Sequence, residues 1–169
     1  AAGMSTRFAP VSYEVPKSLI KVDGEIMIER IIRQLREKGI EEIVVVVGYL
    51  MNKFLYLREK CGVKLVVNHE FRIKNTHSSI YAAQKYLDST YIICADNFFK
   101  ENVFEEYEYQ AFYGAKYIKE LNYERGFFVD SNNLIINTRK PAYDQLVMWG
   151  HAYFSPEFTS KFLPLLNSY

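Results

Sequence analysis

Three short apolar segments, each next to an amphipathic one, restrict the fold of this chain more than any other feature of its sequence. The apolar segments are rich in β-branched residues and predict buried strands: 42–47, 63–67 and 91–95. Segments with apolar residues at helical spacing precede or separate them: 25–38, 51–60 and 77–86. Strands connected by helices form right-handed βαβ units. We therefore expect an α/β fold with a Rossmann-like, mostly parallel sheet flanked by helices.

The pattern changes after Phe98, where aromatic residues begin to alternate with polar ones. Four shorter strands are predicted there: 111–118, 126–130, 134–137 and 148–154. They predict an aromatic-rich β meander in the C-terminal part, followed by a helix from Pro156 to Leu166. The 169 residues suffice for one domain with a sizeable core. We expect a single domain over residues 1–169, truncated at both ends and fused to or followed by a further domain.

Charge and cysteine content exclude several classes of protein. The formal net charge of +1 argues against a broad nucleic-acid surface. The two cysteines, Cys61 and Cys94, lie far apart without the spacing of a zinc site or a disulfide framework. No apolar run reaches the length of a membrane span, and no secretory segment is visible. We expect no nucleic-acid partner, no membrane insertion and a cytoplasmic location.

The first seventeen residues combine a small-residue turn, an arginine and a lysine that follows a proline. Without a Cβ, Gly3 lets backbone N–H groups approach phosphate oxygens closely. Arg7 offers a planar fork of donors, and Lys17, presented by Pro16, a compact positive charge. The phosphate-binding residues that this turn predicts are Ala2, Gly3, Met4, Ser5 and Thr6. The alternative is a plain strand-to-helix connection with solvated charges.

Residues 1–17 read A-A-G-x-x-[ST]-R-[FLM]-x-P…P-K and lead into Ser18–Val22. This string resembles the N-terminal signature of the nucleotidyltransferase superfamily that makes NDP-sugars and CDP-alcohols. Within that superfamily the chain is most similar to bacterial CTP:phosphocholine cytidylyltransferases. That similarity rests on Gly48–Leu57, on the spacing from Val66 through Asn75 to Ser79, and on Ala95–Asn97. The resemblance implies transfer of CMP from CTP to phosphocholine or a similar phosphomonoester, with release of pyrophosphate.

The resemblance also assigns roles to residues at predicted strand ends. Asp96 follows an apolar strand, where ligands bind in α/β sheets, and the resemblance implies that it holds Mg²⁺. Arg7 and Lys17 would act on the departing and incoming phosphates. Gly48 and Tyr49 either hold a nucleobase edge or form a plain turn, and the resemblance places Asn75 and Ser79 near the base and ribose. A second acidic metal ligand is expected beyond Tyr169.

A choline headgroup requires aromatic faces and a carboxylate. The candidates for this acceptor pocket are Tyr123, Glu124, Trp149 and Tyr153, each of which has ordinary packing as its alternative. Three other functions remain open: a sugar-1-phosphate nucleotidyltransferase, a glycosyltransferase with the same type of sheet, and a non-catalytic nucleotide-binding or regulatory domain. The glycosyltransferase is disfavoured because Ala95-Asp96-Asn97 lacks the first acid of an Asp-x-Asp motif.

Overall fold

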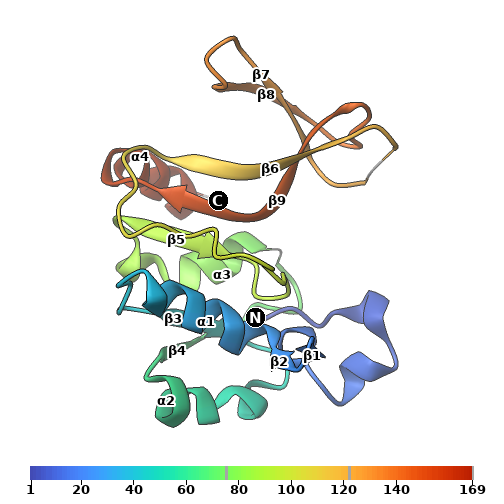
Figure 1. Ribbon diagram of the computed structural model, residues 1–169, viewed down its shortest axis with the longest axis vertical. Helices are drawn as coiled ribbons and strands as arrows, with labels where there is room; N and C mark the ends of the chain where they lie inside the picture. Colours follow the sequence, from blue (N-terminus) through green and yellow to red (C-terminus); the bar gives the residue numbers. More distant parts are fainter. Residues whose placement is uncertain (75, 122, 169) are drawn as a thin grey trace.

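The computed structural model describes residues 1–74, 76–121 and 123–168, and it confirms the α/β class. Helices α1 and α2 lie with strands β3 and β4 in the lower half of Figure 1. A larger sheet built on β5, β6 and β9 lies above them, and the hairpin of β7 and β8 projects from it. The N-terminal segment lies at one side of the lower half. None of the helices in the described ranges is long and apolar enough to cross a membrane.

The lower half is a parallel strand pair covered by helices. Strands β3 (Val44–Val47) and β4 (Lys64–Val67) pair in parallel, with Val44 opposite Lys64. Helix α1 (Met27–Glu37) covers them with one apolar face, because its apolar residues recur at helical spacing. The main core forms here from buried side chains of α1, α2, β3 and adjacent segments, while β4 contributes partly buried ones. Its buried members include Ile28, Ile31, Ile32, Leu35, Val45, Val47, Phe54, Leu57, Phe99 and Phe104.

Helix α1 begins two residues later than the sequence pattern predicted. A short antiparallel hairpin, β1 (Lys21–Val22) and β2 (Glu25–Ile26), occupies the preceding residues. Its two turn residues, Asp23 and Gly24, have φ of 50° and 85°. An Asp-Gly pair with positive φ at both positions is the favoured two-residue hairpin turn. Ile26 lies at helical spacing from the apolar residues of α1, so the sequence pattern favoured a helix there over the Asp-Gly turn.

The other predicted helices of the first half are present but divided. The second becomes a 3₁₀-helix, η4 (Met51–Phe54), followed by α2 (Tyr56–Cys61). Gly62 ends α2 with φ of 64° and donates its N–H to the carbonyl of Arg58 at 3.0 Å. The third begins as α3 (Thr76–Ala82) and continues as η5 (Gln84–Tyr86).

The sheet of the upper half is antiparallel, so parallel pairing covers less of the described chain than the sequence predicted. Strand β9 (Gln145–Phe154) is its long central strand, and three others pair antiparallel with it: β5 (Thr90–Ile93), β6 (Phe112–Ile118) and β7 (Gly126–Val129). Strand β8 (Ile135–Arg139) pairs with β7 at the edge. The apolar run predicted β5 correctly as a strand, but its partner β9 returns from a distant part of the chain in the opposite direction.

Aromatic side chains pack around β9 and the last helix. Helix α4 (Pro156–Asn167) is capped by Ser155, whose hydroxyl accepts the N–H of Phe158 at 3.2 Å. Phe154 packs against Phe158 and Phe162, with ring centroids 4.6 and 5.1 Å away. Part of the high aromatic content therefore fills the space between the upper sheet and α4.

Candidate active site

The N-terminal segment forms a loop of three single-turn 3₁₀-helices: η1 (Thr6–Phe8), η2 (Val11–Tyr13) and η3 (Lys17–Leu19). Ala2 is buried, and its carbonyl accepts the N–H of Tyr49 at 3.1 Å, directly after β3. A side chain at Gly3 would meet no atom within 4 Å, so the turn faces open space there. The start of the loop is thus anchored at the carboxyl end of a strand by the buried Ala2, and the next residue, Gly3, is exposed.

The end of the same loop reaches the carboxyl end of β5. The Lys17 ammonium pairs with the Asp96 carboxylate, with Nζ and Oδ2 2.8 Å apart. These two predicted site residues are 79 positions apart in the chain. Their side chains are 40% and 44% exposed, so both charges are accessible to a ligand. Arg7 is exposed in the same loop and forms no ion pair with any residue that the structure describes.

Strand β9 holds the segment that carries Asp96. The N–H of Cys94 donates to the carbonyl of Gly150 at 2.8 Å. The Asn97 amide donates to the Cys94 carbonyl at 3.0 Å. Gly150 has φ of 73°, and a Cβ there would lie 3.0 Å from the Asn97 amide. A glycine is therefore required for the close approach that fixes the turn after β5.

Asn68 organises the carboxyl end of β4 and was missed in the sequence. It is 3% exposed, and its amide donates to the hydroxyls of Ser78 and Ser79 at 2.9 and 3.1 Å. Its backbone N–H donates to the carbonyl of Val47 at 2.8 Å. Ser79 is thereby held next to the strand end, as the predicted nucleoside site requires. The available signal in the sequence was a polar residue directly after an apolar strand. Asn75, which was predicted together with Ser79 to lie near the nucleoside, is outside the described residues.

The predicted nucleobase contacts at Gly48 and Tyr49 have structural roles of their own. A Cβ at Gly48 would lie 2.9 Å from the side chain of Phe71, so that packing by itself requires a glycine. The Tyr49 N–H is already used by Ala2, and its hydroxyl lies 3.5 Å from the carbonyl of Tyr13. Tyr49 therefore positions the N-terminal loop against the strand end, and Gly48 makes room for Phe71.

Glu124 and Trp149, two of the four predicted acceptor residues, belong to segments next to the one that carries Asp96. The N–H of Met148 donates to the carbonyl of Arg125 at 3.2 Å, which brings Glu124 and Tyr123 beside the segment that precedes Gly150. Burial raises the pKa of the Cys94 thiol, and the carboxylates of Asp96 and Glu124 raise it further. Neighbouring atoms surround much of that thiol, although it still reaches the surface. Glu124 therefore acts electrostatically on the segment that carries Asp96.

Trp149 is accessible, but one cation already lies on it. Its side chain is 49% exposed next to Gly150. The Lys116 ammonium, on the neighbouring strand β6, lies 5.0 Å from the centroid of the indole ring. That contact joins residues of two strands and was not predicted from the sequence.

The assignment of Tyr153 to the acceptor pocket is wrong. Its side chain is 5% exposed, and its hydroxyl bonds to that of Ser89 at the opposite end of β5 from Asp96. Its ring packs against Tyr91, with centroids 5.3 Å apart. Tyr153 therefore packs in the core between β9 and its neighbours β5 and β6.

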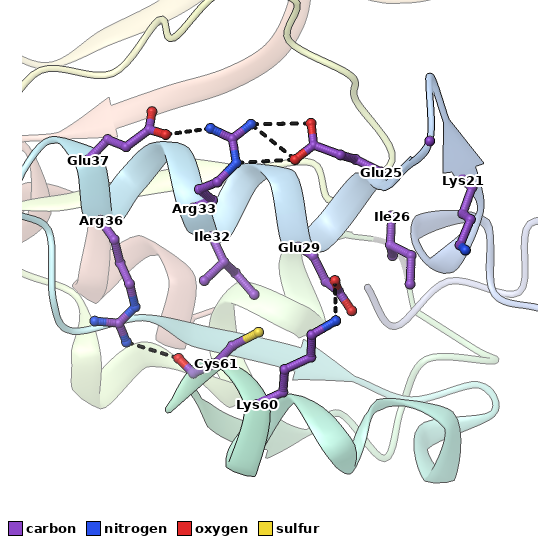
Figure 2. A pocket seen from close by; sticks show the side chains of 11 residues that line it. Lys21, Glu25, Ile26, Glu29, Ile32, Arg33, Arg36, Glu37, Lys60 and Cys61 are labelled. Atoms are coloured by element: carbon purple, nitrogen blue, oxygen red, sulfur yellow. Dashed lines mark hydrogen bonds and ion pairs between the residues drawn. The ribbon is translucent and has the colours of Figure 1, made fainter.

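A groove of about 800 Å³ lies elsewhere, between α1 and α2 (Figure 2). None of the predicted site residues lines it. Most of its charged side chains pair with one another or with the backbone: Lys60 with Glu29 at 2.7 Å, and Arg36 with the Cys61 carbonyl at 3.0 Å. Those contacts offset most of the charge in the groove, so the strand-end site is the better candidate for an anionic nucleotide.

Residues 1–107 match the model of the MobA-like NTP transferase domain. The chain is 42% identical to the choline-phosphate cytidylyltransferase of Streptococcus pneumoniae over 104 residues, which is 62% of this chain and 45% of that protein. It is 39% identical to the 2-aminoethylphosphonate cytidylyltransferase of Lancefieldella rimae over 159 residues, which is 92% of this chain and 65% of that protein.

A solved structure agrees with these matches. The CTP:phosphocholine cytidylyltransferase from Streptococcus pneumoniae superposes with a TM-score of 0.94 at 29% identity, covering 99% of this chain and 73% of that one. The chain thus spans less than two thirds of the length of the two curated relatives. The family match covers the loop, both parallel strands and Asp96. This chain belongs to the family of MobA-like NTP transferase domains.

Proposed function

We propose that this chain carries the transfer site of a cytidylyltransferase, which moves CMP from CTP to a small phosphate or phosphonate that bears a cationic amine. The observation that carries the proposal is the Lys17–Asp96 pair, which joins the glycine-containing loop to the end of β5. An exposed cation, an exposed carboxylate and an open small-residue turn at one edge are what a triphosphate and its counter-ion require. The cytidylyl group and the type of acceptor are supported by the relatives' names.

The reaction balances without a covalent enzyme intermediate. An oxygen of the acceptor's phosphate or phosphonate attacks the α-phosphorus of CTP and forms a new P–O bond. The bond from that phosphorus to the bridging oxygen of the β-phosphate breaks, and its electron pair leaves with pyrophosphate. Catalysis then consists of positioning and charge stabilisation.

Each charged side chain has a distinct task in this proposal. Lys17 binds the α-phosphate and the incoming acceptor, and thereby offsets the charge that two anionic groups bring together. Arg7 binds the departing pyrophosphate with its planar fork of donors. The backbone of residues 2–6 cradles the remaining phosphate oxygens.

A magnesium ion fits the residues present if it arrives with the nucleotide. Asp96 supplies one accessible carboxylate, and the described ranges contain no group of three acidic, histidine or cysteine side chains able to hold a metal. Mg²⁺ is commonly bound by one or two carboxylates together with substrate phosphates and water. When bound, it would neutralise charge on the phosphates. Asp96 would hold it, and Lys17 would exchange the carboxylate for phosphate oxygens.

The test is to incubate the purified protein with CTP, Mg²⁺ and one acceptor at a time, and to follow products by phosphorus NMR. Phosphocholine, phosphoethanolamine, 2-aminoethylphosphonate and glucose 1-phosphate are the acceptors. We expect pyrophosphate and a CMP conjugate with an amine-bearing acceptor. A conjugate with glucose 1-phosphate alone would indicate a sugar nucleotidyltransferase, and CTP binding with no conjugate would indicate a regulatory domain. Either result contradicts the proposal.

A further inference from the structure

The contact between Lys116 and Trp149 places a cation of the protein itself in the proposed acceptor pocket. Lys116 is exposed on β6, and its ammonium lies 5.0 Å from the centroid of the Trp149 ring on β9. Trp149 directly precedes Gly150, whose carbonyl holds the segment that carries Asp96. Trp149 is thus one residue from the backbone bond that fixes the Asp96 segment, and Lys116 covers its ring.

We propose that Lys116 determines acceptor specificity: by occupying the face of Trp149, it makes the pocket select a primary ammonium over a trimethylammonium group. This inference rests on the proposed cytidylyl transfer. The expected acceptors are therefore 2-aminoethylphosphonate or phosphoethanolamine, both of which end in a primary amine, and not phosphocholine.

The two kinds of cation need different partners. A trimethylammonium group has no N–H donor and is recognised by aromatic faces. At Trp149 such a group would either have to displace the Lys116 ammonium from the ring or bind next to that positive charge. Either arrangement would weaken its binding. A primary ammonium has three donors and can bond to a carboxylate without using the ring. Glu124, whose charge acts on Cys94, supplies a carboxylate near this place.

The exposure of the neighbouring aromatic residues agrees with this preference. Tyr153 is buried in the core and cannot contribute a second face to a cage. Tyr123 is 75% exposed, so its ring is not packed against another wall of the pocket.

The first test is the ratio of kcat/KM for 2-aminoethylphosphonate to that for phosphocholine. Wild type is expected to prefer 2-aminoethylphosphonate. Lys116→Ala should shift the ratio about tenfold towards phosphocholine, because the indole face becomes free for the trimethylammonium group. Lys116→Arg keeps a cation on the ring and should keep the wild-type ratio. Lys119→Ala, which removes an exposed lysine one residue beyond β6, is the matched control and should leave the ratio unchanged.

The second test uses Trp149 as a reporter, because it is the single tryptophan of the chain. In Lys116→Ala, phosphocholine should change the tryptophan emission on binding, whereas in wild type it should do so only at about tenfold higher concentration. This titration needs no catalysis. It therefore separates the inference from the proposed function, which fails if no acceptor receives CMP.

Three results would overturn the inference. Wild type could prefer phosphocholine; Lys116→Ala could leave the ratio unchanged; or it could reduce transfer to all acceptors equally, which would make Lys116 a general anchor for the acceptor's anionic group. If Lys116→Ala fails to fold, the wild-type protein decides: a response of Trp149 to phosphocholine at the concentrations that saturate 2-aminoethylphosphonate contradicts the inference.

Discussion

The ion pair between Lys17 and Asp96 is accessible, and this accessibility matters more for function than for stability. Both side chains are about two-fifths exposed. Exposed ion pairs contribute only about 0–1 kcal/mol to folding. The fold therefore loses little when a phosphate replaces the carboxylate as the partner of Lys17. A pair with these properties holds the loop in place without competing strongly with a nucleotide.

Arg7 is expected to act through the geometry of its guanidinium and not through its charge alone. Arg7→Lys keeps the charge but loses the planar fork that binds two phosphate oxygens together. We expect the KM for CTP to rise by about tenfold, equivalent to about 1.4 kcal/mol, with unchanged thermal stability. Steady-state kinetics of pyrophosphate release measure this change. Arg58→Lys, at an exposed position on α2, is the control, and an equal effect there would contradict the assigned role.

His151 makes the fold sensitive to acid. Its ring lies among Phe99, Phe104 and Phe112, with centroids 5.5, 5.9 and 5.6 Å away. Burial lowers the pKa of His151 below the ordinary 6.5, against smaller opposing effects of the Trp149 backbone and Glu108. The unfolded chain therefore binds the proton more readily than the folded one. The stability contribution is complete above about pH 6.5 and is lost as the pH falls towards the lower folded pKa.

The corresponding measurement is the free energy of unfolding between pH 7.5 and 5. We expect it to fall across this interval in wild type and to fall less in His151→Gln, which removes the titrating ring. His69→Gln, at an exposed histidine, should follow wild type. Equal slopes for wild type and His151→Gln would show that this ring is not responsible.

At the level of elements, helix α1 positions the segment that follows Asp96. Its Arg30 donates to the carbonyls of Phe99 and Lys100 at 2.8 and 2.6 Å. The Gln34 amide donates to the carbonyls of Phe99 and Glu101 at 3.1 and 3.2 Å. These bonds satisfy the polar backbone of a segment without regular structure, and they tie it to the helix that forms the main core.

We expect Gln34→Ala to destabilise the protein by about 1–3 kcal/mol, because it removes the donor to the partly buried Glu101 carbonyl and one of the two donors to the Phe99 carbonyl. Gln34 is 2% exposed, so water cannot replace the amide without a rearrangement. Chemical denaturation measures the loss. Gln110→Ala, at an exposed position, is the control and should change stability by less than about 0.5 kcal/mol. A loss of that small size for Gln34→Ala would contradict the positioning role of α1.

Elements whose signals are local could be predicted, and those that depend on distant partners could not. Strands β3 and β4 follow from continuous apolar runs, and the end of α2 follows from Gly62. The hairpin of β1 and β2 carried an Asp-Gly signal that the adjacent helical spacing outweighed. The pairing of β5 with β9 had no local signal, since strand periodicity does not specify a partner.

The same distinction applies to the site. Lys17 and Asp96 could be placed together because each lies in a motif at a strand end. Tyr153 was assigned wrongly because composition cannot tell which aromatic residues of a strand face the core. Lys116 and Trp149 meet only because β6 and β9 are neighbours, and that neighbourhood is a property of the tertiary fold.

At the scale of the whole molecule, the site lies where two differently built halves meet. The lower half contributes the strand ends of β3 and β4, and the upper sheet contributes Asp96 and the acceptor residues (Figure 1). The N-terminal loop contacts both, through Ala2 at one end and Lys17 at the other. A nucleotide bound to the loop would therefore be held by both halves.

The central claim is that Lys17 and Asp96 act on the same nucleotide in one transfer reaction. The measurement that tests it most directly is a double-mutant cycle on the rate of pyrophosphate release from CTP and 2-aminoethylphosphonate, with Lys17→Ala, Asp96→Asn and both together. We predict that each single substitution lowers kcat by about 100-fold or more while the fold is kept, and that the double variant loses far less than the product of the two effects. Turnover within a few-fold of wild type in either single variant, or fully multiplicative losses, would contradict it.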